Sequence, residues 1–376
     1  MSNPMQARAW VDVRLAAIRA NFETVRRIAG ERRAILAMVK ADAYGMGALR
    51  AVRVIEPLSP WGYGVATADE GVALREGGVV RPIVVCSPLP PQSVDTAAKA
   101  GLIATISDIE SLERWAAAAV WHGPLEFHVE IDTGMGRSGF DWRETGAWAE
   151  PVREAASGGQ LRWSGVFTHF HSADAVDAGP SQTQWKRFGD ALAQLPVSCE
   201  DLMVHASNSA AALRWPEFGA DAVRPGIFLY GGTGVEALVR GVPAPEPVAS
   251  VRARVTRVRG VPPGTAVGYG GIWVARGWER WATLSIGYAD GLRRSLANGG
   301  CALIRGCRVP IIGRISMDLT VVEVSAVPDV AVGEVATLLG RDGESEITVD
   351  DVAARAGTIS YEILTGLSRR LPRVEW

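Results

Sequence analysis

Five short motifs each place a reactive polar side chain just after an apolar run. The motifs, with the residues of interest, are VKADAYGMG (Lys40), DTGMGRSGF (Arg137), VFTHFHSAD (His169), HASNSAA (Asn208 and Ser209) and VRPGIFLYG (Arg224). Taken singly, such groups are ordinary, because most lysines and arginines are solvated, a lone histidine is usually a satisfied core group, and an Asn-Ser pair can simply cap a helix. They indicate an active site only if one fold brings them together.

The elements between these motifs alternate in character. Apolar residues at helical spacing predict an amphipathic helix over residues 13–29, and similar patterns predict helices over 108–120 and 182–195. Eight short apolar runs read as buried strands: Ala34–Val39, Tyr63–Ala66, Ile83–Cys86, Ile103–Ile106, Phe127–Ile131, Gly165–Thr168, Met203–His205 and Ala222–Val223. Eight strand–helix units predict an α/β fold with a (β/α)8 TIM barrel, and an open doubly wound sheet is the alternative.

The character of the sequence changes near residue 242. The proline-rich stretch GVPAPEPV (241–248) reads as a linker, and the following VRARVTRV alternates apolar and polar residues as an exposed strand does. Glycine and proline turns recur up to about residue 340, and a short helix is predicted near 349–356. We therefore predict a barrel domain over residues 1–242 and a mostly β C-terminal domain over 243–376.

In a TIM barrel the five motifs would meet, because reactive groups lie at the carboxyl ends of the strands. Ser209 and the backbone N–H groups of Gly226 and Ile227 would suit a phosphate after the last strands, and Gly226 lets the backbone approach closely. A lysine opposite a phosphate cradle suggests a Schiff-base amine that holds a phosphorylated aldehyde. Pyridoxal phosphate fits this description, because it makes the α-hydrogen of an amino acid acidic.

The sequence resembles the alanine racemase family, fold-type III pyridoxal phosphate enzymes, over nearly its full length. The motifs that carry the resemblance are VKADAYGMG, DTGMGRSGF, HASNSAA, VRPGIFLYG, SIGYADG, GRISMD and ISYEILT, in that order. The resemblance implies a pyridoxal 5'-phosphate-dependent isomerase that interconverts L- and D-alanine and supplies D-alanine for peptidoglycan. It also implies a homodimer with shared active sites, and that the first ten or so residues pack with the β domain.

The resemblance also implies a role for each matching position. Lys40 and Tyr288 match the two proton carriers, Lys40 also holding the cofactor and Tyr288 reaching in from the second subunit. The other cofactor-binding positions are Tyr44, His169, Asn208, Ser209, Arg224, Gly226, Ile227 and Tyr361. Arg137 and the backbone of Met317 match contacts to the substrate carboxylate, with Glu130 and Asp318 as supporting residues.

The residue types suit the reaction. Racemisation removes a proton from one face of Cα and returns one to the other, so two carriers are needed, and lysine and tyrosine both require lowered pKa values for this work. Arg224 does not readily give up its proton, so it should leave the pyridine nitrogen that it faces unprotonated. A weaker electron sink follows, which disfavours transamination and decarboxylation.

Two positions depart from the family. Met46 stands where the family often has histidine, and we interpret it as a packing residue. Glu130 stands where the family often has a carbamylated lysine that orients the arginine at position 137. Its carboxylate could supply the same negative charge without modification, or it could pair with some other cation, because a buried acid needs a partner.

Other functions are less consistent with the sequence. A racemase for serine or larger amino acids is the main alternative, whereas a decarboxylase lacks its usual cysteine motif near 340–376 and a non-enzymatic cofactor carrier would not need the β domain. The formal net charge of −2 gives no support for nucleic-acid or membrane partners. Four scattered cysteines suggest neither a disulfide framework nor a metal site. We expect a cytoplasmic protein.

Overall fold

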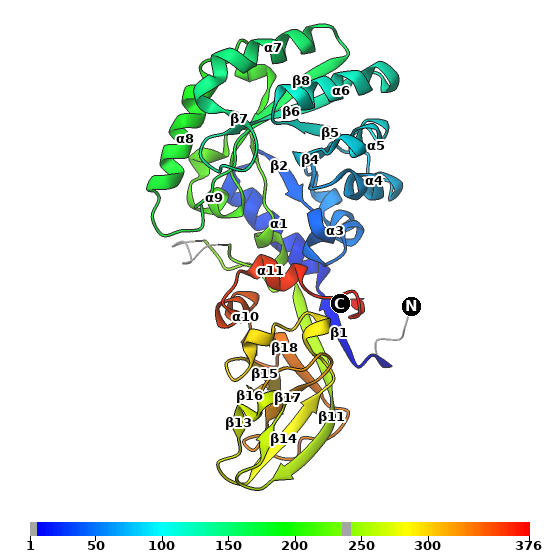
Figure 1. Ribbon diagram of the computed structural model, residues 1–376, viewed down its shortest axis with the longest axis vertical. Helices are drawn as coiled ribbons and strands as arrows, with labels where there is room; N and C mark the ends of the chain where they lie inside the picture. The colour runs from blue at the N-terminus through cyan, green and yellow to red at the C-terminus, as the bar shows by residue number, and fades with distance from the viewer. Residues whose placement is uncertain (1–5, 235–241) are drawn as a thin grey trace.

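The computed structural model describes residues 6–234 and 242–376. Figure 1 shows a barrel with its surrounding helices in the upper part of the view and an elongated β domain below it, with α11 (Ser360–Thr365) lying between them. The predicted linker lies partly outside the described residues.

The barrel is a closed ring of eight parallel strands, which confirms the predicted TIM barrel over the open sheet. Its strands pair in the order β5-β4-β3-β2-β10-β9-β8-β6, and a further pairing of β5 with β6 closes the ring. The strands are β2 (Ala34–Met38), β3 (Gly62–Val65), β4 (Ile83–Pro88), β5 (Ile103–Ile106), β6 (Leu125–Asp132), β8 (Leu161–Phe167), β9 (Met203–His205) and β10 (Ala222–Val223). The short β7 (Phe140–Asp141), which the apolar pattern does not reveal, pairs beside the end of β6.

Helical segments surround or cap this ring, and they include helices that match the three predicted over residues 13–29, 108–120 and 182–195. They are α1 (Leu15–Ala29), α2 (Lys40–Tyr44), α3 (Ala48–Ile55), α4 (Ala68–Glu76), α5 (Val94–Lys99), α6 (Ile109–His122), α7 (Thr145–Ser157), α8 (Gly179–Leu192) and α9 (Ser209–Arg214). α6 begins after Asp108, whose carboxylate accepts a hydrogen bond from the Ser111 N–H (2.6 Å) and so caps the helix. α1 begins two residues later than predicted, because Val13 still belongs to a strand.

Short 3₁₀ helices fill several connections. They are η2 (Glu56–Leu58), η3 (Pro91–Ser93), η4 (Trp142–Glu144), η5 (Cys199–Asp201), η6 (Pro216–Gly219), η7 (Ile227–Tyr230), η8 (Tyr269–Gly271), η9 (Tyr288–Asp290) and η10 (Arg294–Leu296). Two of them, η7 and η9, carry residues that the sequence singled out. The helix α10 (Val349–Ala356) matches the stretch predicted near 349–356.

The second domain is built on a sheet of nine strands in the order β19-β18-β15-β16-β17-β14-β11-β1-β20. They are β1 (Ala9–Val13), β11 (Ala249–Val261), β14 (Glu279–Leu284), β15 (Cys301–Ile304), β16 (Cys307–Ile312), β17 (Thr320–Glu323), β18 (Val335–Asp342), β19 (Ser345–Ile347) and β20 (Arg373–Glu375). A two-stranded sheet of β12 (Ala266–Val267) and β13 (Trp273–Val274) lies apart from it. β1 pairs with β11 and β20, so the start of the chain belongs to this domain.

The two domains share one continuous apolar core. Val11 of β1, Phe22 of α1 and Leu364 of α11 are fully buried members of the same cluster. Tyr44, at the barrel mouth, has its ring 6.0 Å from that of Tyr361 in α11. The second domain therefore contributes directly to the barrel mouth. In the described part of the chain, no helix is long and apolar enough to cross a membrane.

Candidate active site

A cavity of about 120 Å³ lies at the carboxyl ends of the barrel strands and collects most of the predicted site residues. It is lined by Lys40, Tyr44, Arg137, His169, Asn208, Ser209, Arg224, Gly226, Ile227 and Tyr361, together with Met38, Cys86 and Phe167. The first ten were predicted from the sequence. Tyr288 and Met317 do not line this cavity.

Lys40 directly follows β2 and begins an unusual turn. From Ala41 to Tyr44 the backbone φ angles lie between 53° and 56°, so four consecutive non-glycine residues form a left-handed helical turn. This conformation costs roughly 1–2 kcal/mol per residue for an L-amino acid. Gly45 ends the turn, and Asp42 braces it by accepting a hydrogen bond from the Ala48 N–H (2.7 Å). The turn brings both Lys40 and Tyr44 into the cavity within five residues of chain.

One end of the cavity is suited to a phosphate. The Ser209 hydroxyl lies 2.8 Å from the Gly226 N–H that donates to it, so the first turn of α9 and the start of η7 are held together. A Cβ on Gly226 would lie 2.2 Å from the Tyr44 hydroxyl, so only glycine fits there. Burial raises the pKa values of the Tyr44 phenol and, to about 12, of the Tyr361 phenol. Both hydroxyls therefore stay protonated donors.

The other end contains a buried guanidinium. Arg224 donates to the carbonyl oxygens of Thr168 (2.9 Å) and Ala206 (3.0 Å), and its Nη1 lies 2.8 Å from His205 Nδ1. Its Nη2 lies 3.2 Å from Nδ1 of His169. Burial lowers the pKa of Arg224 to about 10, which still leaves it charged at neutral pH.

A chain of hydrogen bonds runs from Arg224 into the barrel interior and fixes the histidine tautomers. Because a guanidinium only donates, His205 Nδ1 must accept, and its Nε2–H must then donate to Nδ1 of His128 at 2.9 Å. His128 therefore carries its proton on Nε2, which has no hydrogen-bond partner among the described residues. Burial, reinforced by the Arg224 charge, lowers the pKa of His128 to about 3 and that of His205 in the same direction.

Glu130, near the end of β6, lies beside Arg137 but has a different direct partner. Its Oε2 accepts a hydrogen bond from the Ser138 hydroxyl (2.6 Å). Burial raises the pKa of Glu130, and the Ser138 bond and the Arg137 charge oppose that rise. The Glu130 carboxylate thus bonds to the residue that follows Arg137 in the chain. A direct pairing with Arg137 stays a prediction.

Tyr288, Met317 and Asp318 lie together on the surface of the second domain. The side chains of Tyr288 and Met317 are 43% and 53% exposed. The Tyr288 N–H donates to Ser316 O and the Ala289 N–H to Met317 O, both at 3.0 Å. These three residues therefore lie outside the cavity of their own chain.

Three cavity residues were not predicted. Cys86 lies two residues before the end of β4, Met38 ends β2, and Phe167 ends β8 with its ring centroid 5.2 Å from the guanidinium carbon of Arg224. The only signal for them in the sequence is their place at strand ends. Met46 is fully buried in the apolar core, as its interpretation as a packing residue requires. No group of three His, Cys, Asp or Glu side chains suited to a metal occurs within the described ranges.

Comparison with known proteins agrees with this geometry. Residues 13–234 match the family described as alanine racemase, N-terminal domain, and residues 248–375 match alanine racemase, C-terminal domain. The chain belongs to the alanine racemase family. Among curated members, alanine racemase from Halothermothrix orenii is 37% identical, covering 97% of this chain and 96% of that protein. Alanine racemase 2 from Bacillus subtilis is 36% identical, covering 97% and 93%.

Solved structures of the family have the same fold. Alanine racemase from E. faecalis aligns with a TM-score of 0.90 at 34% identity, covering 98% of both chains. The Bartonella henselae enzyme, solved with covalently bound pyridoxal phosphate, aligns with a TM-score of 0.87 at 27% identity, covering 98% of this chain and all of that one. The family resemblance therefore extends over both domains.

Proposed function

We propose that the protein is an alanine racemase that uses pyridoxal 5'-phosphate to interconvert L- and D-alanine, and so supplies D-alanine for peptidoglycan. The observation that carries the proposal is the single cavity that contains an amine, a phosphate cradle and a buried guanidinium. Family membership supports the same conclusion.

The cavity residues fit the cofactor. Lys40 would hold its aldehyde carbon, and Tyr44, Ser209, Tyr361 and the backbone at Gly226 would hold its phosphate, where a Cβ on Gly226 would fill the space. Asn208 caps α9 by accepting a hydrogen bond from the Ala211 N–H (3.0 Å), which holds the Ser209 end of the cradle. When bound, pyridoxal phosphate supplies an electron-withdrawing ring that makes the substrate α-hydrogen acidic.

The protein's own groups then direct the reaction. Arg224 stays charged, so it would favour an unprotonated nitrogen on a bound pyridine ring and would limit side reactions. Arg137 would bind the substrate carboxylate, with a backbone contact from Met317 of a second subunit. Lys40 would move the proton on one face of Cα, and Tyr288 of the second subunit would move it on the other. The exposure of Tyr288 and Met317 is consistent with a homodimer in which each subunit completes the other's cavity.

The test is isotope incorporation with inversion. The purified holoenzyme is incubated separately with L-alanine, L-serine and L-lysine in heavy water. The enantiomers are then separated by chiral chromatography, and their deuterium content is measured by mass spectrometry. We expect D-alanine with deuterium at Cα, and much less inversion of the other two. If serine or lysine is inverted faster than alanine, that amino acid is the substrate instead of alanine. Inversion of none would contradict the proposal.

Variants then test the role of Lys40. Lys40→Ala should lose both racemisation and the visible absorbance band of the protein-bound cofactor. The matched control is Lys186→Ala, because Lys186 is an exposed lysine on α8. It should retain both. A Lys40→Ala protein that kept the full band after removal of free cofactor would refute the assignment.

A further inference from the structure

The carboxylate of Asp290 is fully buried and closes the turn that carries Tyr288. Asp290 is the last residue of η9, and its Oδ2 accepts a hydrogen bond from the Gly287 N–H (3.0 Å). The Asp290 N–H donates in return to Gly287 O (3.1 Å). The turn from Gly287 to Asp290 is thus closed by both a side-chain and a backbone bond.

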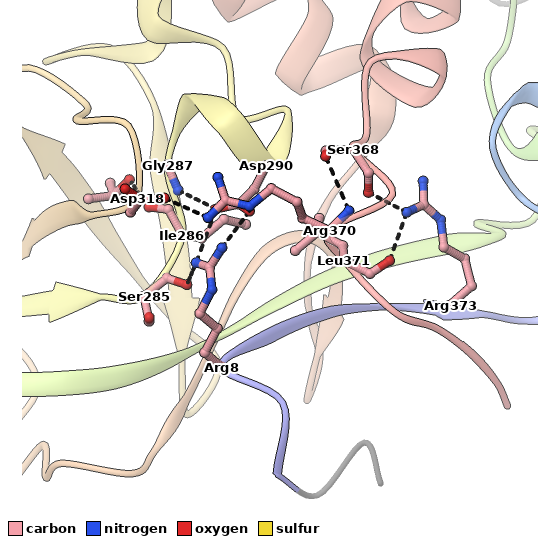
Figure 2. Close-up of polar contacts among 11 residues, drawn as sticks. Arg8, Ser285, Ile286, Gly287, Asp290, Asp318, Ser368, Arg370, Leu371 and Arg373 are labelled. Atoms are coloured by element: carbon pink, nitrogen blue, oxygen red, sulfur yellow. Dashed lines mark hydrogen bonds and ion pairs between the residues drawn. The ribbon is translucent and has the colours of Figure 1, made fainter. Parts of the chain in front are cut away.

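Two arginines from opposite ends of the chain reach this carboxylate (Figure 2). Arg8 binds it with both terminal nitrogens, at 2.6 Å to Oδ1 and 3.1 Å to Oδ2, and also donates to Ser285 O (2.6 Å). Arg370 lies with Nε 3.5 Å from Asp290 Oδ1. A forked arginine–carboxylate pair fixes orientation as well as distance. The carboxylate is therefore held at a defined angle on the turn.

Arg370 also connects the turn to the neighbouring loop. Its Nη2 donates to Asp318 Oδ1 (2.6 Å), and Asp318 follows Met317. The two backbone bonds from Tyr288 and Ala289 already join the turn to this loop. A Cβ on Gly287 would lie 2.3 Å from the carbonyl oxygens of Ser316 and Met317, so the two segments are in close contact. The Tyr288 turn and the Met317 loop are therefore joined into one unit by hydrogen bonds and close contact.

This unit matters because the Tyr288 ring cannot take its position from the cavity of its own chain. The ring is 43% exposed on the domain surface. Its place in a second subunit is therefore set by the backbone of the turn, and a reacting group must be held to within about 0.5 Å of its working geometry. Removing one partner of a buried ion pair strongly destabilises a protein. The paired arrangement of Asp290 with its arginines is therefore strongly favoured over an unpaired one.

We propose that Asp290 is a positioning residue for racemisation, which with Arg8 and Arg370 holds the Tyr288 turn and the Met317 loop in the arrangement that proton transfer needs. The inference rests on the proposed function, because it assumes that Tyr288 moves a proton at Cα. It assigns to both ends of the chain a role in the active site of the neighbouring subunit.

The test is Asp290→Asn, which keeps an acceptor for the Gly287 N–H but removes the charge. Exchange of the α-hydrogen with heavy water is measured for L-alanine and D-alanine separately, on holoenzyme saturated with cofactor. Under the proposed function we assign the proton of L-alanine to Tyr288 and that of D-alanine to Lys40. We therefore expect L-alanine exchange to fall by about 10- to 100-fold and D-alanine exchange by less than about threefold. The cofactor absorbance band, which depends on Lys40, should not change.

The matched control is Asp12→Asn. Asp12, in the same sheet, forms an ion pair with Arg252 (3.1 Å) and bonds to Trp10 rather than to the Tyr288 turn. Asp12→Asn should lower the midpoint of thermal unfolding and leave the ratio of the two exchange rates as in the wild type. A second variant, Arg8→Lys, keeps the charge but loses the fork. It should lower L-alanine exchange selectively by about two- to fivefold, and it decides the question if Asp290→Asn does not fold.

The two proposals fail in different ways. If the wild type exchanges neither enantiomer, the proposed function fails. If the wild type is active and the folded variants lose both exchanges equally, or lose neither, the positioning role is overturned while the function stands.

Discussion

Arg224 Nη1 lies 2.8 Å from His205 Nδ1, so the buried guanidinium of the cavity donates to an imidazole. The acceptor is neutral, because burial lowers the pKa of His205. A carboxylate in this place would have neutralised Arg224. The neutral partner instead leaves the charge of Arg224 without an anion at this contact, which under the proposed function would keep a bound pyridine nitrogen unprotonated.

The neutral histidines should make the protein sensitive to acid. His128 has a pKa of about 3 when folded and 6.5 when unfolded, so the unfolded chain binds one more proton between these two pH values. The free energy of unfolding should therefore be at its full value above pH 6.5 and should fall toward pH 3. His128 alone should account for a loss of about 1.4 kcal/mol per pH unit. Urea unfolding midpoints measured from pH 7 to pH 4.5 check this. In His128→Asn the slope should be smaller by about one proton, and an unchanged slope would contradict the assignment.

Replacing Ala41 with glycine should stabilise the protein. Ala41 is exposed and has φ of 53°, and its side chain gains nothing from the left-handed turn. After the entropy cost of glycine is subtracted, Ala41→Gly should raise the free energy of unfolding by about 0.5–1 kcal/mol. The control is Ala117→Gly on the exposed face of α6, which should lower it by about 1 kcal/mol. Chemical denaturation of both variants gives the comparison, and equal signs would count against a strained turn.

Gly226→Ala should weaken cofactor binding. The new methyl group would lie 2.2 Å from the Tyr44 hydroxyl, so Tyr44 or η7 must move out of the phosphate cradle. We expect the dissociation constant for pyridoxal phosphate to rise by about tenfold or more, measured by titrating cofactor-free protein. Gly146→Ala in α7, where no atom lies within 4 Å of the new carbon, should bind as the wild type does. Wild-type affinity in both variants would show that the cradle lies elsewhere.

Tyr288→Phe should separate the two proton transfers. Without the phenol, inversion should fall by at least about a hundredfold, because general acid–base catalysis by one group typically contributes that much. Exchange of the α-hydrogen should slow mainly for L-alanine, since Lys40 still serves the other face. Tyr269→Phe is the control, because Tyr269 is also an exposed tyrosine of the second domain. Equal slowing for both enantiomers would argue against Tyr288 as the second proton carrier.

Much of this architecture could be predicted because buried parallel strands leave apolar runs in the sequence. All eight barrel strands were found, and ten of the predicted residues line one cavity, since strand ends converge in a closed barrel. The left-handed turn could not be predicted, because KADAY consists of residues that usually favour right-handed helices or turns. The contacts of Asp290 could not be predicted from the sequence either. Arg8 is 282 residues away in the chain, and only the folded sheet brings the two together.

The pairing of β1 with β11 and β20 has a consequence for how the chain is made. β1 is translated before the barrel strands, yet its neighbours begin at Ala249 and Arg373. A ribosome must therefore release all eight barrel strands before β1 finds its first partner, and α11 as well before it finds its second. Until then β1 has unpaired edges that could join another nascent chain. Completion of the sheet that carries the Tyr288 turn therefore follows synthesis of the barrel.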